Sequence, residues 1–287
     1  MGKILVTGSL HYDIVIQADH RPEKGETVIG SHCSYKFGGK GGNQAVSAAR
    51  AGARVRFAGA VGADDQGHFL RAVLNEHGID TRYVAVTDAV PSGISVALMD
   101  VQGDYGAVVV SNANNHIEPQ QFSDDNLWQQ VNMLLLQNEV PEAVNLQAAT
   151  QAKRRGITVC LNAAPARELG ASMQSCVDLL VVNAIEARDL SGVAVLNLQD
   201  ACSAAEILSR SYPAVVVTAG EHGVAFCETG QSSQSLPAKK IELVSTHGAG
   251  DCFMGMLCTS LLQGRSLAQS VANANLAAAE HVSRKAS

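Results

Sequence analysis

Short apolar runs alternating with longer helical segments are the feature of this sequence that most narrows its possible folds. The runs are apolar on both faces, as the strands of a buried parallel sheet are: "KILVTG", "VRFAGAVG", "MLLLQ", "GITVCL", "VDLLVV" and "PAVVVTAG". The segments between them repeat apolar residues every three or four positions, which indicates helices; examples are "PEAVNLQAATQAKRRG" and "QDACSAAEILSRSY". This alternation predicts an α/β fold built of βαβ units, with helices on both faces of a mainly parallel sheet.

Two segments, residues 12–37 and 92–111, interrupt this alternation. They contain strand-like stretches with little helix between them, namely "DIVIQ", "ETVIGSHCSYKFG", "GISVALMD" and "YGAVVVS". We expect them to form a small second sheet that covers a ligand as a lid. Because no proline-rich or serine-rich linker separates them from the rest, we expect a single domain over residues 1–287.

Charge and cysteine content exclude several classes of function. A formal net charge of −6 argues against binding to nucleic acid or to an anionic membrane, which needs many basic contacts. The seven cysteines are odd in number and form no C-x-x-C pair, so we expect reduced thiols. No signal-peptide pattern and no apolar run near the ~18 residues of a membrane span occur, which favours a cytoplasmic protein.

The first of two glycine clusters, "FGGKGGNQAVSAARAG" at residues 37–52, places four glycines and Lys40 at the start of a helical pattern. Glycine so often repeated predicts a close approach of another group to the main chain. The alternative interpretation is a flexible loop.

The second cluster, "HGAGD" at residues 247–251, precedes another helical pattern. Backbone N–H groups at a helix N-terminus attract anions, so Gly248, Ala249 and Gly250 are candidates for an anion hole. Asp251 in the first turn is either a general base beside that hole or an acid that complements the helix dipole. The sequence has no P-loop motif, no dinucleotide-binding fingerprint, no H-E-x-x-H and no G-x-S-x-G.

The two clusters together resemble the signatures of the ribokinase-like (PfkB) carbohydrate kinase family. "GGKGGNQAVSAARAGA" is similar to its N-terminal signature and "HGAGDCFMGML" to its C-terminal one. Between them, "LLLQNEVP", "LNAAPAREL", "VVNAIEARDLSG" and "VVVTAGEHGV" follow in the family's order. The resemblance implies a three-layer α/β/α sandwich with a small β lid that also pairs in a homodimer. It also implies transfer of the γ-phosphoryl group of ATP, with Mg²⁺, to a sugar hydroxyl.

The resemblance further implies a role for individual residues. Asp251 corresponds to the base, beside the anion hole of Gly248, Ala249 and Gly250. The positions that hold the sugar are His11, Asp13, Gly39, Lys40, Asn43, Glu139 and Asp251. Those that contact the nucleotide are Asn183, Thr218, Gly220, Gly223, Gly250 and Asn275. Glu186 corresponds to the residue that holds Mg²⁺ through water, although the pair Asn183 and Glu186 alone also fits a helix cap with a solvated acid.

Three departures from the family pattern bear on substrate and ion binding. His11 stands where ribokinases of the family carry Asn, which changes the shape and hydrogen bonding of the sugar pocket; the alternative is a polar side chain satisfied at a strand end. Ser245 replaces an Asp of the family's potassium site, and the chain ends at Ser287, near the last ligands of that site. These two differences argue against a K⁺ site.

The sequence leaves three functions open. The first is an ATP-dependent kinase of ribose or a related pentose, and the second is a nucleoside kinase of the same superfamily. The third is a non-catalytic sensor of sugar or nucleotide, against which the "GAGD" tract argues, because a sensor needs no base beside an oxyanion hole.

Overall fold

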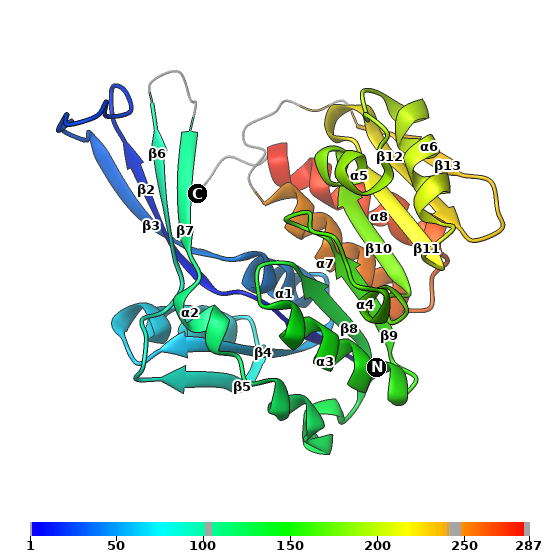
Figure 1. Ribbon diagram of the computed structural model, residues 1–287, viewed down its shortest axis with the longest axis horizontal. Helices are drawn as coiled ribbons and strands as arrows, with labels where there is room; N and C mark the ends of the chain where they lie inside the picture. The colour runs from blue at the N-terminus through cyan, green and yellow to red at the C-terminus, as the bar shows by residue number, and fades with distance from the viewer. Residues whose placement is uncertain (1, 101–104, 240, 242–247, 284–287) are drawn as a thin grey trace.

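The main sheet contains nine strands in the order β13-β12-β11-β10-β9-β8-β1-β4-β5 (Figure 1). The structure is a computed structural model that describes residues 2–100, 105–239, 241 and 248–283. The strands of the main sheet are β1 (Lys3–Thr7), β4 (Arg54–Gly62), β5 (Asp80–Thr87), β8 (Val131–Gln137), β9 (Thr158–Asn162), β10 (Leu179–Asn183), β11 (Ala214–Thr218), β12 (Gly223–Glu228) and β13 (Gln234–Pro237). The run from β11 to β5 is parallel, and β12 and β13 add antiparallel pairs at one edge. The predicted α/β class with a mainly parallel sheet is confirmed.

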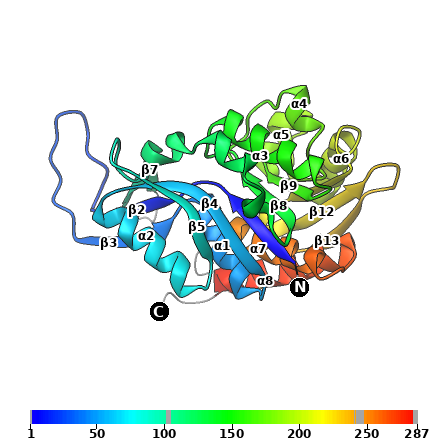
Figure 2. The ribbon, with the colours of Figure 1, turned by 90° about the horizontal axis from the view of Figure 1, so that it is seen from below.

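Helices cover both faces of this sheet, and Figure 2 shows the two layers on opposite sides. One layer contains α1 (Lys40–Arg50), α2 (Asp65–Glu76), α7 (Ala249–Leu262) and α8 (Leu267–Ser283). The other contains α3 (Glu142–Arg154), α4 (Ala171–Gln174), α5 (Ala184–Ser191) and α6 (Leu198–Leu208). Short 3₁₀ turns occur at Asn112–His116, Pro119–Ser123, Asp125–Trp128 and Gly220–His222. Among the described residues, no helix is long and apolar enough to cross a membrane.

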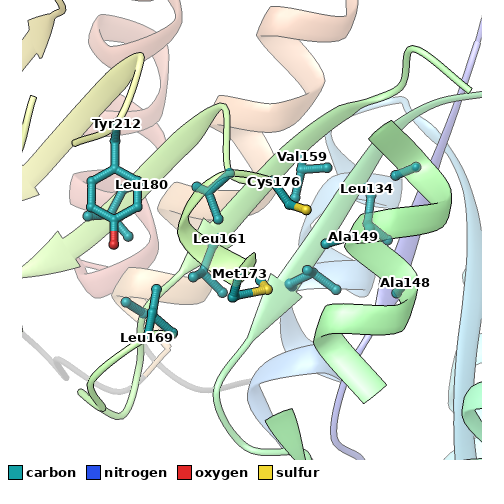
Figure 3. Close-up of a cluster of buried hydrophobic side chains, with 14 of the residues drawn as sticks. Leu134, Ala148, Ala149, Val159, Leu161, Leu169, Met173, Cys176, Leu180 and Tyr212 are labelled. Carbon is teal, nitrogen blue, oxygen red and sulfur yellow. The ribbon is translucent and has the colours of Figure 1, made fainter. Parts of the chain in front are cut away.

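Alternating side chains of each central strand supply the two apolar cores. In β8, Leu134 and Leu136 belong to the core under α3, whereas Met133 and Leu135 belong to the core under α1 and α7. Figure 3 shows part of the first core, where Leu134, Leu161 and Leu180 of three adjacent strands face the helical layer. Because both faces of each strand are buried, the strands are continuous apolar runs rather than alternating ones.

A separate sheet of four strands stands beside the main body (Figure 1). Its order is β3 (His32–Gly38), β2 (His11–Gln17), β6 (Ile94–Met99) and β7 (Tyr105–Val110), with β2 and β6 parallel and the other pairs antiparallel. The ring of Tyr12 packs edge-on against Phe69 of α2, which ties this sheet to the main body. The predicted small sheet is confirmed, but the strand expected over "ETVIGSHCSYKFG" starts only at His32, because its partner strand β2 ends at Gln17, which pairs with His32.

The order of the strands creates a switch point between β1 and β8. After β1 the chain passes through the small sheet and α1 to β4 on one side, whereas after β8 it passes through α3 to β9 on the other side. Connections that leave in opposite directions open a crevice at the carboxyl ends of the two strands, where ligands of open α/β sheets bind.

Close packing of main chain on main chain explains the first glycine cluster. A Cβ atom at Gly41 would lie 2.6 Å from the backbone nitrogen of Ser9, and one at Gly39 would lie 2.8 Å from the Ser9 carbonyl oxygen. Gly39 also has a φ of 87°, a conformation that favours glycine. The space at these two glycines is therefore taken by the segment that follows β1, and α1 starts directly against it.

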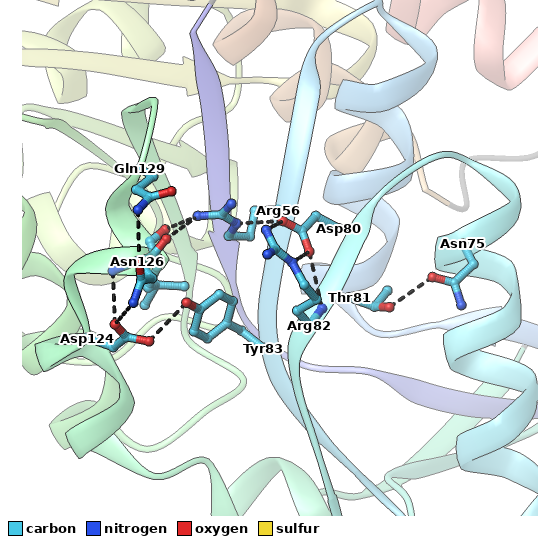
Figure 4. Close-up of polar contacts among 10 residues, drawn as sticks. Arg56, Asn75, Asp80, Thr81, Arg82, Tyr83, Asp124, Asn126 and Gln129 are labelled. Carbon is cyan, nitrogen blue, oxygen red and sulfur yellow. Dashed lines mark hydrogen bonds and ion pairs between the residues drawn. The ribbon is translucent and has the colours of Figure 1, made fainter.

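A buried arginine joins the amino ends of β4 and β5 to the turn that precedes β8 (Figure 4). Arg56 is 1% exposed; its Nε donates to Asp80 Oδ2 at 2.8 Å, and its Nη1 donates to the carbonyl oxygens of Asn126 and Leu127. Arg82, whose side chain is 72% exposed, binds the same carboxylate. Hydrogen bonds from Arg82 and Arg56 hold the pKa of Asp80 well below its usual range.

We predict that Arg56→Met lowers the free energy of unfolding by about 3 kcal/mol, because two buried carbonyl groups and a carboxylate lose their donor. Arg82→Met, which removes an exposed partner of the same Asp80, should cost less than about 1 kcal/mol. Urea denaturation at pH 7 measures both, and equal losses would contradict this assignment. The pKa of Asp80 is lower in the folded protein than in the unfolded chain, so its charge stabilises the fold at pH values above the pKa of the unfolded chain. The contribution of Arg56 to the free energy of unfolding should therefore shrink as the pH falls toward the pKa of Asp80 in the folded protein.

Candidate active site

The polar residues at the carboxyl ends of the central strands form one continuous edge. Ser9 follows β1, Glu139 follows β8, and Asn162, Asn183 and Thr218 are the last residues of β9, β10 and β11. Adjacent parallel strands end side by side, and Asn183 pairs in register with Thr218. At this edge Asn183 caps α5, and the backbone N–H of Lys40 in α1 donates to Glu139; α7 contacts α1 through the hydrogen bond from Gln44 to Asp251.

Asp251 lies in the first turn of α7 and is half-buried. Its Oδ2 accepts a hydrogen bond from Asn43 Nδ2 at 3.3 Å, and its Oδ1 accepts one from Gln44 Nε2 at 3.0 Å. Burial raises the pKa of Asp251, while the charge of Lys40 and the two amide donors oppose the rise. A carboxylate with a raised pKa is better suited to take a proton than an ordinary surface aspartate.

The start of α7 has space beside Gly250. Gly248 precedes the helix with a φ of 74°, and within the described part of the chain no atom outside the neighbouring residues and the helix's own backbone lies within 4 Å of the position that a Cβ at Gly250 would take. The first backbone N–H groups of a helix have no partner inside the helix, so Ala249 and Gly250 can offer them to an anion. Ser245 of the expected potassium site lies outside the described residues.

Glu139 is held at one of its two carboxylate oxygens. Its Oε2 accepts hydrogen bonds from Ser9 Oγ at 2.5 Å and from the backbone N–H of Lys40 at 2.9 Å, and the Nδ1 of His11 lies 3.9 Å away. Among the described residues, no hydrogen bond to Oε1 occurs. An oriented carboxylate with one unoccupied oxygen is a suitable acceptor for a substrate hydroxyl.

Two further residues of the predicted sugar group stand at the start of the small sheet. His11 is 3% exposed, and burial lowers its pKa against the opposing charges of Glu139 and Asp13, which favours the neutral imidazole. Its Nε2 is buried and has no hydrogen-bond partner within the described part of the chain. Asp13 Oδ1 accepts a hydrogen bond from Ser95 Oγ at 2.6 Å, which joins β2 to β6.

Asn183 and Glu186 form a capping box at the start of α5. Asn183 Oδ1 accepts from the backbone N–H groups of Ile185 and Glu186, and Glu186 Oε2 accepts from the N–H of Asn183, each at 2.9 Å. The helix-cap interpretation of this pair is therefore correct, but the acid is 5% exposed rather than solvated. Burial raises the pKa of Glu186, and the nearby charge of Lys40 opposes that rise.

The predicted nucleotide residues gather near α5 and the antiparallel edge. Thr218 Oγ1 contacts the carbonyl of Val182 at 3.4 Å, and Asn275 of α8 donates to the carbonyl of Pro237 at 3.1 Å. Gly220 and Gly223, with φ of 55° and 121°, shape the turn between β11 and β12. Among the described residues, no group of three or more His, Cys, Asp or Glu is arranged to hold a metal ion.

Sequence reasoning missed polar residues that support the acids Asp251, Glu139 and Asp13, directly or through one another: Ser9, Gln44, Ser95, Gln137 and Asn162. Gln44 stands in the quoted glycine cluster, and its signal was an amide on the apolar face of a helix that must pack on the sheet. Ser9, Gln137 and Asn162 share another signal, because each lies at or just after the end of an apolar run.

The site can now be compared with known proteins. The model of the family described as pfkB family carbohydrate kinase matches residues 1–287. Ribokinase of Bacillus subtilis (strain 168) is 34% identical over 281 residues, covering 97% of this chain and 92% of that protein. Ribokinase of Haemophilus influenzae is 32% identical over 284 residues, covering 98% and 92%. A structure of Arabidopsis thaliana ribokinase complexed with ribose and ATP has a TM-score of 0.91 at 25% identity, covering 100% of this chain and 94% of that one.

Fold and site thus define a phosphotransferase with an alcohol group as acceptor. The chain belongs to the pfkB family of carbohydrate kinases, as its two glycine signatures predicted.

Proposed function

We propose that this kinase transfers the γ-phosphoryl group of ATP to a hydroxyl of ribose or a related pentose. The observation that carries the proposal is the position of Asp251. It lies at the N-terminus of α7, has both carboxylate oxygens held by amides of α1, and is within electrostatic reach of Lys40 and Glu139. Relatives that are ribokinases, one of them solved with ribose and ATP, support this choice of substrates.

Asp251 would accept the proton of the attacking hydroxyl. Its raised pKa favours proton uptake during the attack, and the amides of Asn43 and Gln44 keep the carboxylate oriented. The N–H groups of Gly248, Ala249 and Gly250 would face the oxygens of the transferred phosphoryl group, where preorganised donors stabilise developing charge.

The sugar would lie between α1 and the small sheet. Glu139 and Asp13 supply acceptors for its hydroxyls, and Lys40 and Asn43 supply donors. The neutral imidazole of His11 borders the same pocket beside Glu139, and the main chain at Gly39 completes the floor.

ATP would extend from the anion hole toward Asn183, Thr218, Gly220, Gly223 and Asn275. The donor set suits Mg²⁺ as well, because the ion prefers oxygen ligands and keeps several waters, and Glu186 presents a buried carboxylate near Lys40. When bound, Mg²⁺ neutralises charge on the phosphates. Glu186 would accept hydrogen bonds from the water around it while also capping α5.

The small sheet would act as a lid over the sugar and as the contact of a homodimer, within a single domain spanning residues 1–287. Its edge strand β7 exposes Val108, Val109 and Val110 by 69%, 51% and 47%, and an exposed apolar edge strand favours pairing with another chain. We also propose that the protein works in the cytoplasm, where its seven cysteines stay reduced. Neither a K⁺ site nor a nucleic-acid or membrane partner is part of the proposal.

We predict that Asp251→Asn lowers kcat by about 10²–10⁴, because the neutral amide accepts no proton, while the KM for ATP changes little. Substrate-dependent release of ADP measures both. Asp65→Asn is the matched control, since it removes the first-turn acid of α2 and should leave turnover unchanged. Unchanged turnover in Asp251→Asn would refute the mechanism. Binding of sugar by the native chain without any turnover of ATP would favour a sensor.

We predict that Glu186→Gln raises the Mg²⁺ concentration needed for half-maximal rate by about tenfold. The glutamine carbonyl still accepts from the Asn183 N–H, so the cap and the thermal unfolding temperature should be kept. The control is Asp200→Asn, which alters the first-turn acid of α6 and should leave the Mg²⁺ dependence unchanged. The same Mg²⁺ dependence in both variants would restrict Glu186 to the cap.

We predict that ribose or a related pentose has the highest kcat/KM in a panel of pentoses, other furanoses and nucleosides. His11→Asn, which introduces the amide that ribokinases of the family carry, should change the ratio of kcat/KM among the pentoses, since the imidazole borders Glu139. A preference for nucleosides by about a hundredfold would identify the alternative, a nucleoside kinase.

A further inference from the structure

Gln44 is a fully buried polar side chain that is connected directly to the proposed base. It lies in the first turns of α1, one residue after Asn43, and its exposed fraction is 0%. Its Nε2 donates to Asp251 Oδ1 at 3.0 Å and to Asn162 Oδ1 at 2.9 Å, and its Oε1 accepts from Gln137 Nε2 at 2.8 Å. The amide therefore joins α1 to α7, β8 and β9 at one point.

The chemistry of the partners fixes which way this amide points. A carboxylate only accepts hydrogen bonds, so the amide nitrogen must face Asp251, and the carbonyl then faces the donor group of Gln137. Asn162 is held in turn, because its Nδ2 donates to the carbonyl of Val181 at 3.2 Å. The strands that form the floor of the site thus determine the orientation of Gln44, which determines the position of Asp251 Oδ1.

We propose that Gln44 is a positioning residue for phosphoryl transfer, which orients the Asp251 carboxylate and stabilises its charged form. The inference rests on the proposed role of Asp251 as the base. A glutamine needed only for packing would donate both of its N–H groups to residues of the sheet. Gln44 donates one to Asn162 of β9 and the other to the carboxylate of Asp251 on α7.

Electrostatics gives this role a measurable sign. Burial raises the pKa of Asp251, and Lys40, Gln44 and Asn43 lower it, while Glu139 adds to the rise. Asp251 also lines a pocket of about 320 Å³, and the further charged or titratable groups that the described residues place around it are Lys36, Arg50, Cys252, Glu280 and His281. None of these changes when Gln44 is replaced, so removal of its donor should raise the pKa of Asp251 further.

The test is the pH profile of Gln44→Met, which has a similar volume but no donor. The acidic limb of kcat/KM should move up by about one pH unit, with the greatest loss of activity at low pH. The side-chain carboxyl carbon of Asp251, assigned in ¹³C NMR spectra by its absence in Asp251→Asn, should titrate at a correspondingly higher pH. Uniform loss of activity with an unmoved limb and an unmoved titration would overturn the proposal.

Two further variants keep the result interpretable. Gln44→Glu retains the oxygen that accepts from Gln137 but places a second carboxyl group against Asp251. It should therefore shift the acidic limb of kcat/KM and the ¹³C titration of Asp251 at least as far as Gln44→Met does. This variant supplies the test if Gln44→Met does not fold. Ser47→Ala removes another hydrogen bond between α1 and α7, from Ser47 Oγ to the Cys252 carbonyl, and should shift neither.

Failure of this inference is distinguishable from failure of the proposed function. If Asp251→Asn is as active as the native chain, the assigned base is wrong whatever Gln44 does. If Asp251→Asn is inactive and the Gln44 variants titrate as the native chain does, only the role of Gln44 is refuted.

Discussion

The close approach of α1 to the segment after β1 is the constraint on which the site depends. Gly39 and Gly41 bring the start of the helix into contact with the main chain at Ser9, where a side chain on either glycine would collide. This contact sets the N–H of Lys40 against Glu139 and aims Asn43 and Gln44 at Asp251. Loss of the contact would therefore displace acceptor, donors and base together.

Charge in this site is stabilised mainly by oriented hydrogen bonds rather than by paired ions. Burial raises the pKa values of Asp251 and Glu186, and Lys40 opposes both rises from its place at the start of α1. Amides and backbone N–H groups hold the carboxylates, and fixed dipoles of this kind need no reorganisation when charge moves during a reaction. A partly destabilised carboxylate is also the form best able to take a proton.

The capping box at α5 gives the same atoms a structural role and, under the proposal, a functional one. Asn183 and Glu186 satisfy the first N–H groups of the helix, and this fixes the acid at the carboxyl edge of the sheet near Lys40. Under the proposed function, the same cap would hold Glu186 as a rigid acid for the nucleotide and its metal ion. The cap and the proposed role are compatible, since each oxygen of the carboxylate has more than one lone pair.

The sequence by itself determined the α/β class, the extra sheet, the family and the position of Asp251, because apolar periodicity and short glycine motifs are local properties of the chain. It predicted a close approach of another group to the glycine cluster but could not identify Ser9 as that group, because no local pattern connects Gly41 with a residue 32 positions away. Only the tertiary structure decided that Gln44, Gln137 and Asn162 converge behind Asp251 and that Glu139 has one oxygen held and one free of protein hydrogen bonds among the described residues. These relations depend on strand order and on the packing of α1 and α7 against the sheet, which join residues up to 207 positions apart that no local pattern connects.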